Sequence, residues 1–101
     1  MTPLSALGAE LRTEVIDGIQ RGVLTFVCPI CRIGNRLMHH QPVVIYGDGP
    51  PTTCSLGSVY KRVHGTTIDD LSLAPPVEID ANPGTICPGG SALILHGAWQ
   101  S

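Results

Sequence analysis

The chain has 101 residues, of which 14% are charged and 43% are hydrophobic, and its formal net charge is −2. This composition is too apolar and too weakly charged for intrinsic disorder, and no apolar run approaches the roughly 18 residues of a membrane-spanning helix. The length predicts a single domain over residues 1–101. The first eight residues lack the basic region and apolar core of a secretory signal, so we expect a cytoplasmic protein or one of an intracellular assembly.

The first predicted element is an N-terminal helix over residues 3–21. Pro3 suits the first helical position, Gly22 is a natural stop, and apolar residues recur between them at three- or four-residue spacing. These apolar residues are Leu4, Leu7, Leu11, Val15 and Ile19. Such a stripe predicts packing on the domain's own sheet, with docking to a partner protein as the alternative.

From residue 23 onward, short β-prone runs alternate with Gly and Pro, a texture typical of a compact β structure with many turns. The expected strands cover residues 23–27, 42–46, 58–64, 77–79 and 92–96. They predict a β-rich core over residues 23–64 and 77–99, and a loop or arm over residues 65–90. The predicted fold class is therefore α+β and mostly β, with one N-terminal helix before a small loop-rich antiparallel sheet or barrel.

The most informative motif is Cys28-Pro29-Ile30-Cys31, which follows a β-prone run and precedes Gly34. It resembles the metal knuckle of zinc-ribbon and RING-type domains, and the resemblance implies a structural zinc ion held by two thiolates of the motif. Such an ion needs two further protein ligands, and spacing does not choose among the candidates. The candidates are Cys54, Cys87 and His39, followed by His40, His64 and His96.

Two other states of the cysteines stay open, namely buried thiols and disulfides. Zinc is favoured because a domain of this size, with four aromatic residues, has a small core that a cross-link would support. The same motif is also similar to the active site of glutaredoxins, which implies a thioredoxin-like fold and a reactive Cys28 thiolate. In glutaredoxins the motif opens a helix, whereas here Gly34 follows Cys31 by three residues and many Gly and Pro residues come later.

Three classes of function follow from these observations. The favoured class is a non-catalytic structural or interaction subunit that assembles with copies of itself or with a larger complex, as small accessory proteins of viral particles do. The second is a zinc-dependent nucleic-acid-binding module that would use four basic residues with Phe26 or Tyr60 for stacking, although the low net charge disfavours nucleic acid as a partner. Those basic residues are Arg32, Arg36, Lys61 and Arg62. The third is a glutaredoxin-like thiol redox enzyme.

Overall fold

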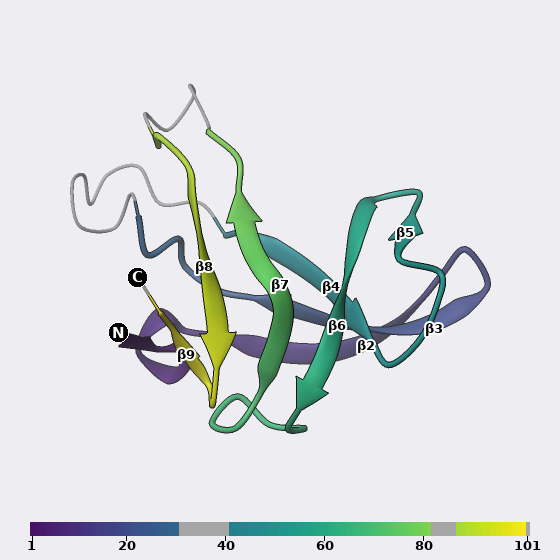
Figure 1. The fold of residues 1–101 in the computed structure, drawn as a ribbon, viewed down its shortest axis with the longest axis horizontal. Coiled ribbons are helices and arrows are strands. Elements are labelled where there is room, and N and C mark those ends of the chain that lie inside the picture. Colours follow the sequence, from purple (N-terminus) through teal and green to yellow (C-terminus); the bar gives the residue numbers. More distant parts are fainter. Residues whose placement is uncertain (31–40, 82–86, 101) are drawn as a thin grey trace.

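The computed structural model describes residues 1–30, 41–81 and 87–100. Its elements are β1 (Thr2–Pro3), the 3-10 helix η1 (Leu4–Leu7), β2 (Glu10–Ile16), β3 (Ile19–Thr25), β4 (Val43–Gly47), β5 (Thr53–Cys54), β6 (Gly57–His64), β7 (Ser72–Ile79), β8 (Gly90–Leu95) and β9 (Ala98–Trp99). The strands form one nine-stranded sheet that curls into a half-barrel. In Figure 1, β7 and β8 run steeply across the view while β2 and β3 run almost horizontally, because the sheet turns along its width.

The strand order in the sheet is β1-β9-β8-β7-β6-β4-β3-β2, and β5 pairs with β6 outside this path. Neighbouring strands are antiparallel except β4 and β6, which are parallel with Ile45 opposite Val59. The segment of residues 48–56 therefore crosses over between two parallel strands and carries β5 with it. In this strand order β4, β6 and β7 separate β3 from β8. Side chains of β3 and β8 nevertheless pack into one core in the hollow on the inner face of the curled sheet.

The N-terminal helix predicted over residues 3–21 is wrong. Only Leu4–Leu7 is helical, as a single 3-10 turn, and β2 and β3 form a hairpin with seven consecutive residue pairs. Asp17 and Gly18 lie at its tip with φ of 54° and 78°, and a two-residue turn with two positive φ values matches the twist of the flanking strands. The described residues contain no α-helix, and none of their helical segments is long and apolar enough to cross a membrane.

The loop or arm expected over residues 65–90 contains strand β7, which pairs with β6 on one side and β8 on the other. Pro75 and Pro76 are tolerated inside this strand because the β7–β8 register shifts between Leu73 and Val77. A proline has no N–H to donate, so an interrupted stretch of the ladder is where it fits. The expectation of a mostly β chain agrees with the structure, whereas the α+β class does not.

The main core lies on the inner face of the curled sheet. Phe26 and Trp99 are fully buried at its centre, with ring centroids 6.2 Å apart. Their buried neighbours include Leu4, Leu7, Leu24, Val44, Leu71, Leu73, Val77 and Ile94. Gly22 is required on this face because the Tyr46 ring of the adjacent strand lies over it, and a Cβ at that position would overlap the ring.

A smaller buried cluster lies on the opposite face of β3, β4 and β6. Val23, Ile45 and Val59 are paired across these strands and are at most 8% exposed. Beside them, the buried Arg21 guanidinium donates hydrogen bonds to the carbonyl oxygens of Gly49 (2.9 Å) and Pro51 (2.8 Å). Arg21 thereby fixes the crossover segment to the sheet.

Candidate functional site

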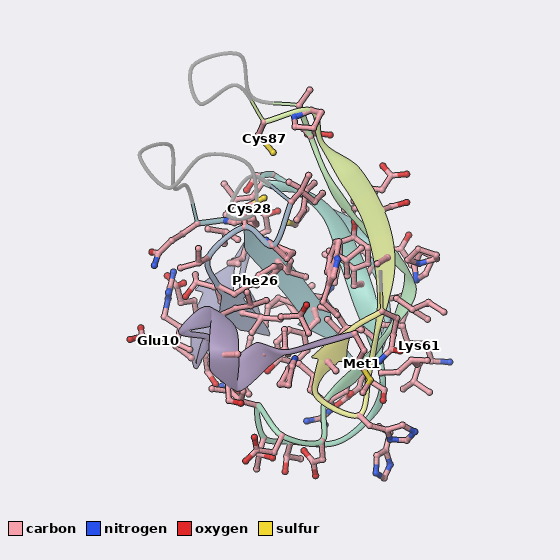
Figure 2. All side chains as sticks on the ribbon, turned by 90° about the vertical axis from the view of Figure 1, so that its left-hand side faces the viewer. Met1, Glu10, Phe26, Cys28, Lys61 and Cys87 are labelled. Atoms are coloured by element: carbon pink, nitrogen blue, oxygen red, sulfur yellow. The ribbon has the colours of Figure 1, made fainter. Side chains whose placement is uncertain are left out.

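Two of the predicted metal ligands meet at one end of the half-barrel. Cys28 follows β3 and Cys87 precedes β8, and their Sγ atoms are 3.7 Å apart although the residues are 59 positions apart in sequence. Figure 2 shows both sulfurs at the upper end of the molecule, beyond Phe26. The side chains are 0% and 3% exposed, so the site is buried. A disulfide would need a separation of about 2.05 Å, so these sulfurs contact each other as a hydrogen-bonded pair.

Local structure explains why the two sulfurs face each other. After β3 the chain keeps its alternation, with Phe26 and Cys28 buried, and the Val27 N–H donates to the Leu7 carbonyl oxygen over 2.8 Å. On the other side, Gly89 has φ +76°, and a Cβ there would lie 2.7 Å from the Ile79 carbonyl oxygen. Only glycine allows the chain to pass so close to the end of β7 and leave Cys87 inside the hollow.

The other sequence-predicted ligands are not brought to this pair within the described residues. Cys54 lies half-buried in β5, which is at the right of Figure 1, whereas β8 begins at the upper left. Cys31 and His39 lie outside residues 1–30, 41–81 and 87–100, as does His40. Within those ranges no group of three or more His, Cys, Asp or Glu side chains is arranged to hold a metal ion.

His64 and His96 form a second pair, at the end of β6 and in the turn after β8. Their rings meet edge to face with centroids 6.3 Å apart. Nearby, Asp70 accepts hydrogen bonds from the backbone N–H groups of Thr66 and Thr67 and from the Thr67 hydroxyl. These bonds, chiefly those from Thr67, lower the pKa of Asp70 and brace the turn between β6 and β7.

Three of the side chains expected to bind nucleic acid are engaged in contacts within the protein. Phe26 is fully buried and cannot stack on a base, and the Tyr60 hydroxyl accepts a hydrogen bond from the Glu78 N–H at 3.1 Å. Arg62 donates to Asp48 over 2.8 Å, and this bond raises the pKa of Arg62. Arg32 and Arg36 lie outside the described residues. The described part of the chain therefore offers Lys61 but no assembled basic and aromatic surface.

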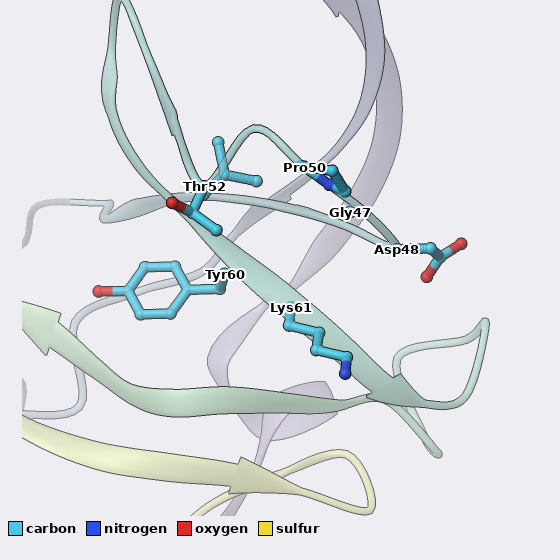
Figure 3. A pocket seen from close by; sticks show the side chains of 8 residues that line it. Gly47, Asp48, Pro50, Thr52, Tyr60 and Lys61 are labelled. Carbon is cyan, nitrogen blue, oxygen red and sulfur yellow. The ribbon is translucent and has the colours of Figure 1, made fainter.

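The crossover segment and β6 border a shallow pocket of about 250 Å³, shown in Figure 3. Tyr60 and Lys61 contribute side chains from β6, and Asp48, Pro50 and Thr52 contribute from the crossover. Among the described residues the lining contains neither histidine nor cysteine, and its carboxylate, Asp48, is paired with Arg62. Asp48 and Tyr60 are held in structural contacts, so we assign no chemistry to this pocket.

Sequence reasoning missed two features of the molecule that bear on function. The pairing of Cys28 with Cys87 could not be chosen by spacing, because it depends on a sheet whose strand order the sequence does not reveal. The β2–β3 hairpin had a readable signal in Asp17-Gly18, since Asp-Gly between β-prone runs is a strong hairpin marker. That dipeptide outweighs the helical spacing of Leu11, Val15 and Ile19.

Comparison of the chain with protein-family models, curated proteins and solved structures found no match. The thioredoxin-like fold that a glutaredoxin resemblance implies also differs from the single curled sheet of the described residues.

Proposed function

We propose that the protein is a non-catalytic structural or interaction subunit in which a zinc ion bound by Cys28 and Cys87 joins the two sides of the half-barrel. The observation that carries this proposal is the 3.7 Å separation of the two Sγ atoms. Two thiolates at about 2.3 Å from a tetrahedral zinc ion lie about 3.8 Å apart. For the two remaining places the sequence offers Cys31, three residues after Cys28, and His39.

The position of the pair supports a structural role. Strands β3 and β8 do not pair with each other, because β4, β6 and β7 lie between them. A metal bridge from Cys28 to Cys87 would therefore connect the two sides of the hollow directly, because β3 and β8 share no ladder of backbone hydrogen bonds. In a domain of 101 residues such a cross-link supplements a small core.

Burial argues for a structural thiol pair over a catalytic one. A reactive cysteine needs a partly exposed, electropositive environment that stabilises the thiolate and admits the substrate. Cys28 and Cys87 are almost fully buried beside Phe26 and Ile79 in the main core. The redox-enzyme alternative therefore has less support than the structural one.

The interaction that we propose is assembly with copies of the same chain or binding to another protein. The comparison with accessory proteins of viral particles depended partly on an extended arm, and residues 72–79 of that expected arm form the interior strand β7. Exposed apolar side chains support contact with protein surfaces, among them Val15, Val43 and Val63 on the sheet and Leu56 between β5 and β6.

The test compares three cysteine variants of the full chain. Cys28→Ser and Cys87→Ser remove one sulfur each from the pair, while Cys54→Ser is the matched control because Cys54 lies in β5, away from the pair. We expect one zinc ion per chain in the wild type and in Cys54→Ser, and loss of that zinc in the other two variants. Losing the metal should also lower the free energy of unfolding by about 3 kcal/mol or more.

Zinc content is measured by native mass spectrometry, and stability by thermal and denaturant unfolding. Wild-type stability and unchanged zinc content in Cys28→Ser would overturn the proposal. A zinc-free wild type that isolates with Cys28 and Cys87 joined in a disulfide would overturn it as well. Selective alkylation of Cys28 near neutral pH would instead support the redox alternative.

A further inference from the structure

The two edges of the sheet differ in how they are protected against pairing with another chain. At one end lies β1, which has two residues, and one of them is Pro3 with no N–H to donate. At the other end lies β2, which has seven residues and pairs with β3 on one side only. A strand with one side unpaired presents a row of N–H and C=O groups to a further strand.

The unpaired side of β2 carries three charged residues, Glu10, Arg12 and Glu14, which alternate in sign, but it lacks the other usual devices that discourage strand addition. Its sequence, Glu10–Ile16, contains no proline, glycine or lysine, and its seven pairs with β3 run without a bulge. Short edge strands, prolines and bulges protect edges in most sheets, and β1 uses the first two. The edge formed by β2 is therefore long, regular and open within the described part of the chain.

The hairpin that carries this edge is held in place before any partner arrives. The Asp17 carboxylate at its tip accepts a hydrogen bond from the Ser55 N–H at 2.7 Å, which ties the turn to the segment after β5. On the inner face Leu11 packs against the main core and pairs with the fully buried Leu24. A pre-positioned strand loses little conformational freedom on binding, which favours association.

The side chains of β2 are complementary to a second copy of the same strand. In an antiparallel pair centred on Thr13, Arg12 of one copy lies opposite Glu14 of the other, and Glu14 lies opposite Arg12. The same register places Leu11 opposite Val15, and Val15 is 71% exposed in the single chain. Opposite charges and apolar residues that face each other directly across strands stabilise a sheet.

The pairing costs few existing contacts. Arg12 donates to Glu14 of its own chain at 2.8 Å, but both side chains are about half exposed, at 49% and 48%. Such a surface ion pair contributes little to stability by itself. In the proposed register both charges keep an opposite partner and gain a second one, so four charges alternate in sign around the centre of the pair.

We propose that β2 is a homodimerisation edge: two copies of the chain pair antiparallel through residues 10–16, with Thr13 of both copies on the two-fold axis. This inference deepens the interaction role proposed above, and it does not depend on the metal at Cys28 and Cys87. Pairing of this kind is isologous, so the contact uses the same surface on both copies and closes after two. The half-barrel thereby extends into a continuous sheet across the dimer.

The decisive experiment is cross-linking through a cysteine placed on the predicted axis, in the full chain carrying Cys54→Ser. Residues directly opposite in an antiparallel pair have Cα atoms about 4.5–5.5 Å apart, which a disulfide can bridge. We expect Thr13→Cys to form a covalent dimer on incubation with oxidised glutathione. Gln20→Cys is the matched control, because Gln20 lies on β3 in the same hairpin and pairs with Val15 of its own chain.

A charge exchange tests the register separately. Arg12→Glu places like charges opposite each other at two symmetric positions and should raise the dimer Kd at least about tenfold in analytical ultracentrifugation. The double variant Arg12→Glu/Glu14→Arg restores opposite charges across the axis and should return the Kd to near the wild-type value. Unfolding of each variant is recorded to show that the fold persists.

The outcomes separate this inference from the proposed metal site. A monomeric wild type at several hundred micromolar, with Thr13→Cys no more cross-linked than Gln20→Cys, overturns the dimer while leaving zinc binding untouched. Heteromeric binding through β2 by such a monomer would assign the edge to another protein and likewise overturn it. Selective cross-linking at position 13 together with rescue by the double variant supports the proposed register, whatever the zinc content of the protein.

Discussion

The end of the half-barrel that contains Cys28 and Cys87 and the end formed by the β2–β3 hairpin are stabilised in different ways. At the cysteine end, buried side chains from β3, β7 and β8 meet around two sulfurs, and no strand pairing links β3 to β8. At the hairpin end, a seven-pair ladder, the Asp17 bond to Ser55 and the Arg21 bonds to the crossover segment hold the structure. The first end depends on long-range packing, to which the proposed zinc ion would add a cross-link, and the second end depends on hydrogen bonds.

Phe26→Ala should have the largest effect on the cysteine end, apart from loss of the cysteines themselves. The Phe26 ring is fully buried, with its centroid 6.2 Å from that of Trp99, and it lies below Cys28 and Cys87 in Figure 2, so its removal leaves a cavity at this end. We expect the free energy of unfolding to fall by about 3–5 kcal/mol in urea denaturation, and Phe26→Leu to lose much less. A loss below about 1 kcal/mol for Phe26→Ala would contradict the packing described for this end.

Arg21→Met should have the next largest effect and should act on the hairpin end. Methionine retains the apolar stem but leaves the Gly49 and Pro51 carbonyl oxygens without their donor. The expected loss of unfolding free energy is about 2–3 kcal/mol, and Arg21→Lys should recover only part of it because an ammonium does not reproduce the guanidinium fork. Equal stability of the methionine variant and the wild type would show that these bonds do not hold the crossover.

Gly22→Ala tests the contact between β3 and the Tyr46 ring. A methyl group at position 22 requires the ring to move, and overpacking of this kind costs about 1–3 kcal/mol. Near-ultraviolet circular dichroism should record the displaced tyrosine together with the lower unfolding midpoint. An unchanged aromatic spectrum would contradict the close approach of ring and backbone.

Acid titration should give the smallest difference and should involve the hairpin tip. The bond from the Ser55 N–H lowers the pKa of Asp17 below its ordinary value of 3.8. A carboxylate with a lowered pKa in the folded state stabilises the protein above the ordinary value, and this stabilisation is lost as the pH falls through the folded pKa.

Asp17→Asn keeps a residue that tolerates positive φ but removes the charge, so it isolates this effect. The variant should be slightly less stable than the wild type near neutral pH, and the difference should shrink below about pH 4. Stability is followed by urea unfolding at several pH values. A difference that stays constant or grows toward low pH would contradict the role of the Asp17 carboxylate.

The sequence predicted the strands better than their arrangement. Residues 42–46 and 58–64 were expected as strands and overlap β4 (Val43–Gly47) and β6 (Gly57–His64), because both segments are rich in β-branched and aromatic residues. The helix failed because Leu11, Val15 and Ile19 satisfy helical spacing by coincidence while the local turn chemistry specifies a hairpin. Local patterns also do not encode the parallel β4–β6 pairing, which depends on contacts between distant segments.

The candidate site was predicted in part. The motif at Cys28 drew attention to metal binding, and Cys87 was one of several residues offered for the other ligands. Its selection depends on the strand order that brings β3 and β8 to opposite sides of one hollow, which is a property of the whole sheet. Cys54 was an equal candidate by sequence, yet it lies in β5, where it pairs with Gly57 at the start of β6.

Native mass spectrometry of the wild-type protein before and after chelation is the measurement that decides whether zinc bridges Cys28 and Cys87. We expect one zinc ion per chain with Cys28 and Cys87 reduced, and removal of the zinc should lower the unfolding temperature. Loss of the metal should also increase hydrogen exchange in β8 before it does so in the β2–β3 hairpin. A metal-free protein whose stability and hydrogen exchange do not respond to chelation would contradict a zinc bridge between Cys28 and Cys87.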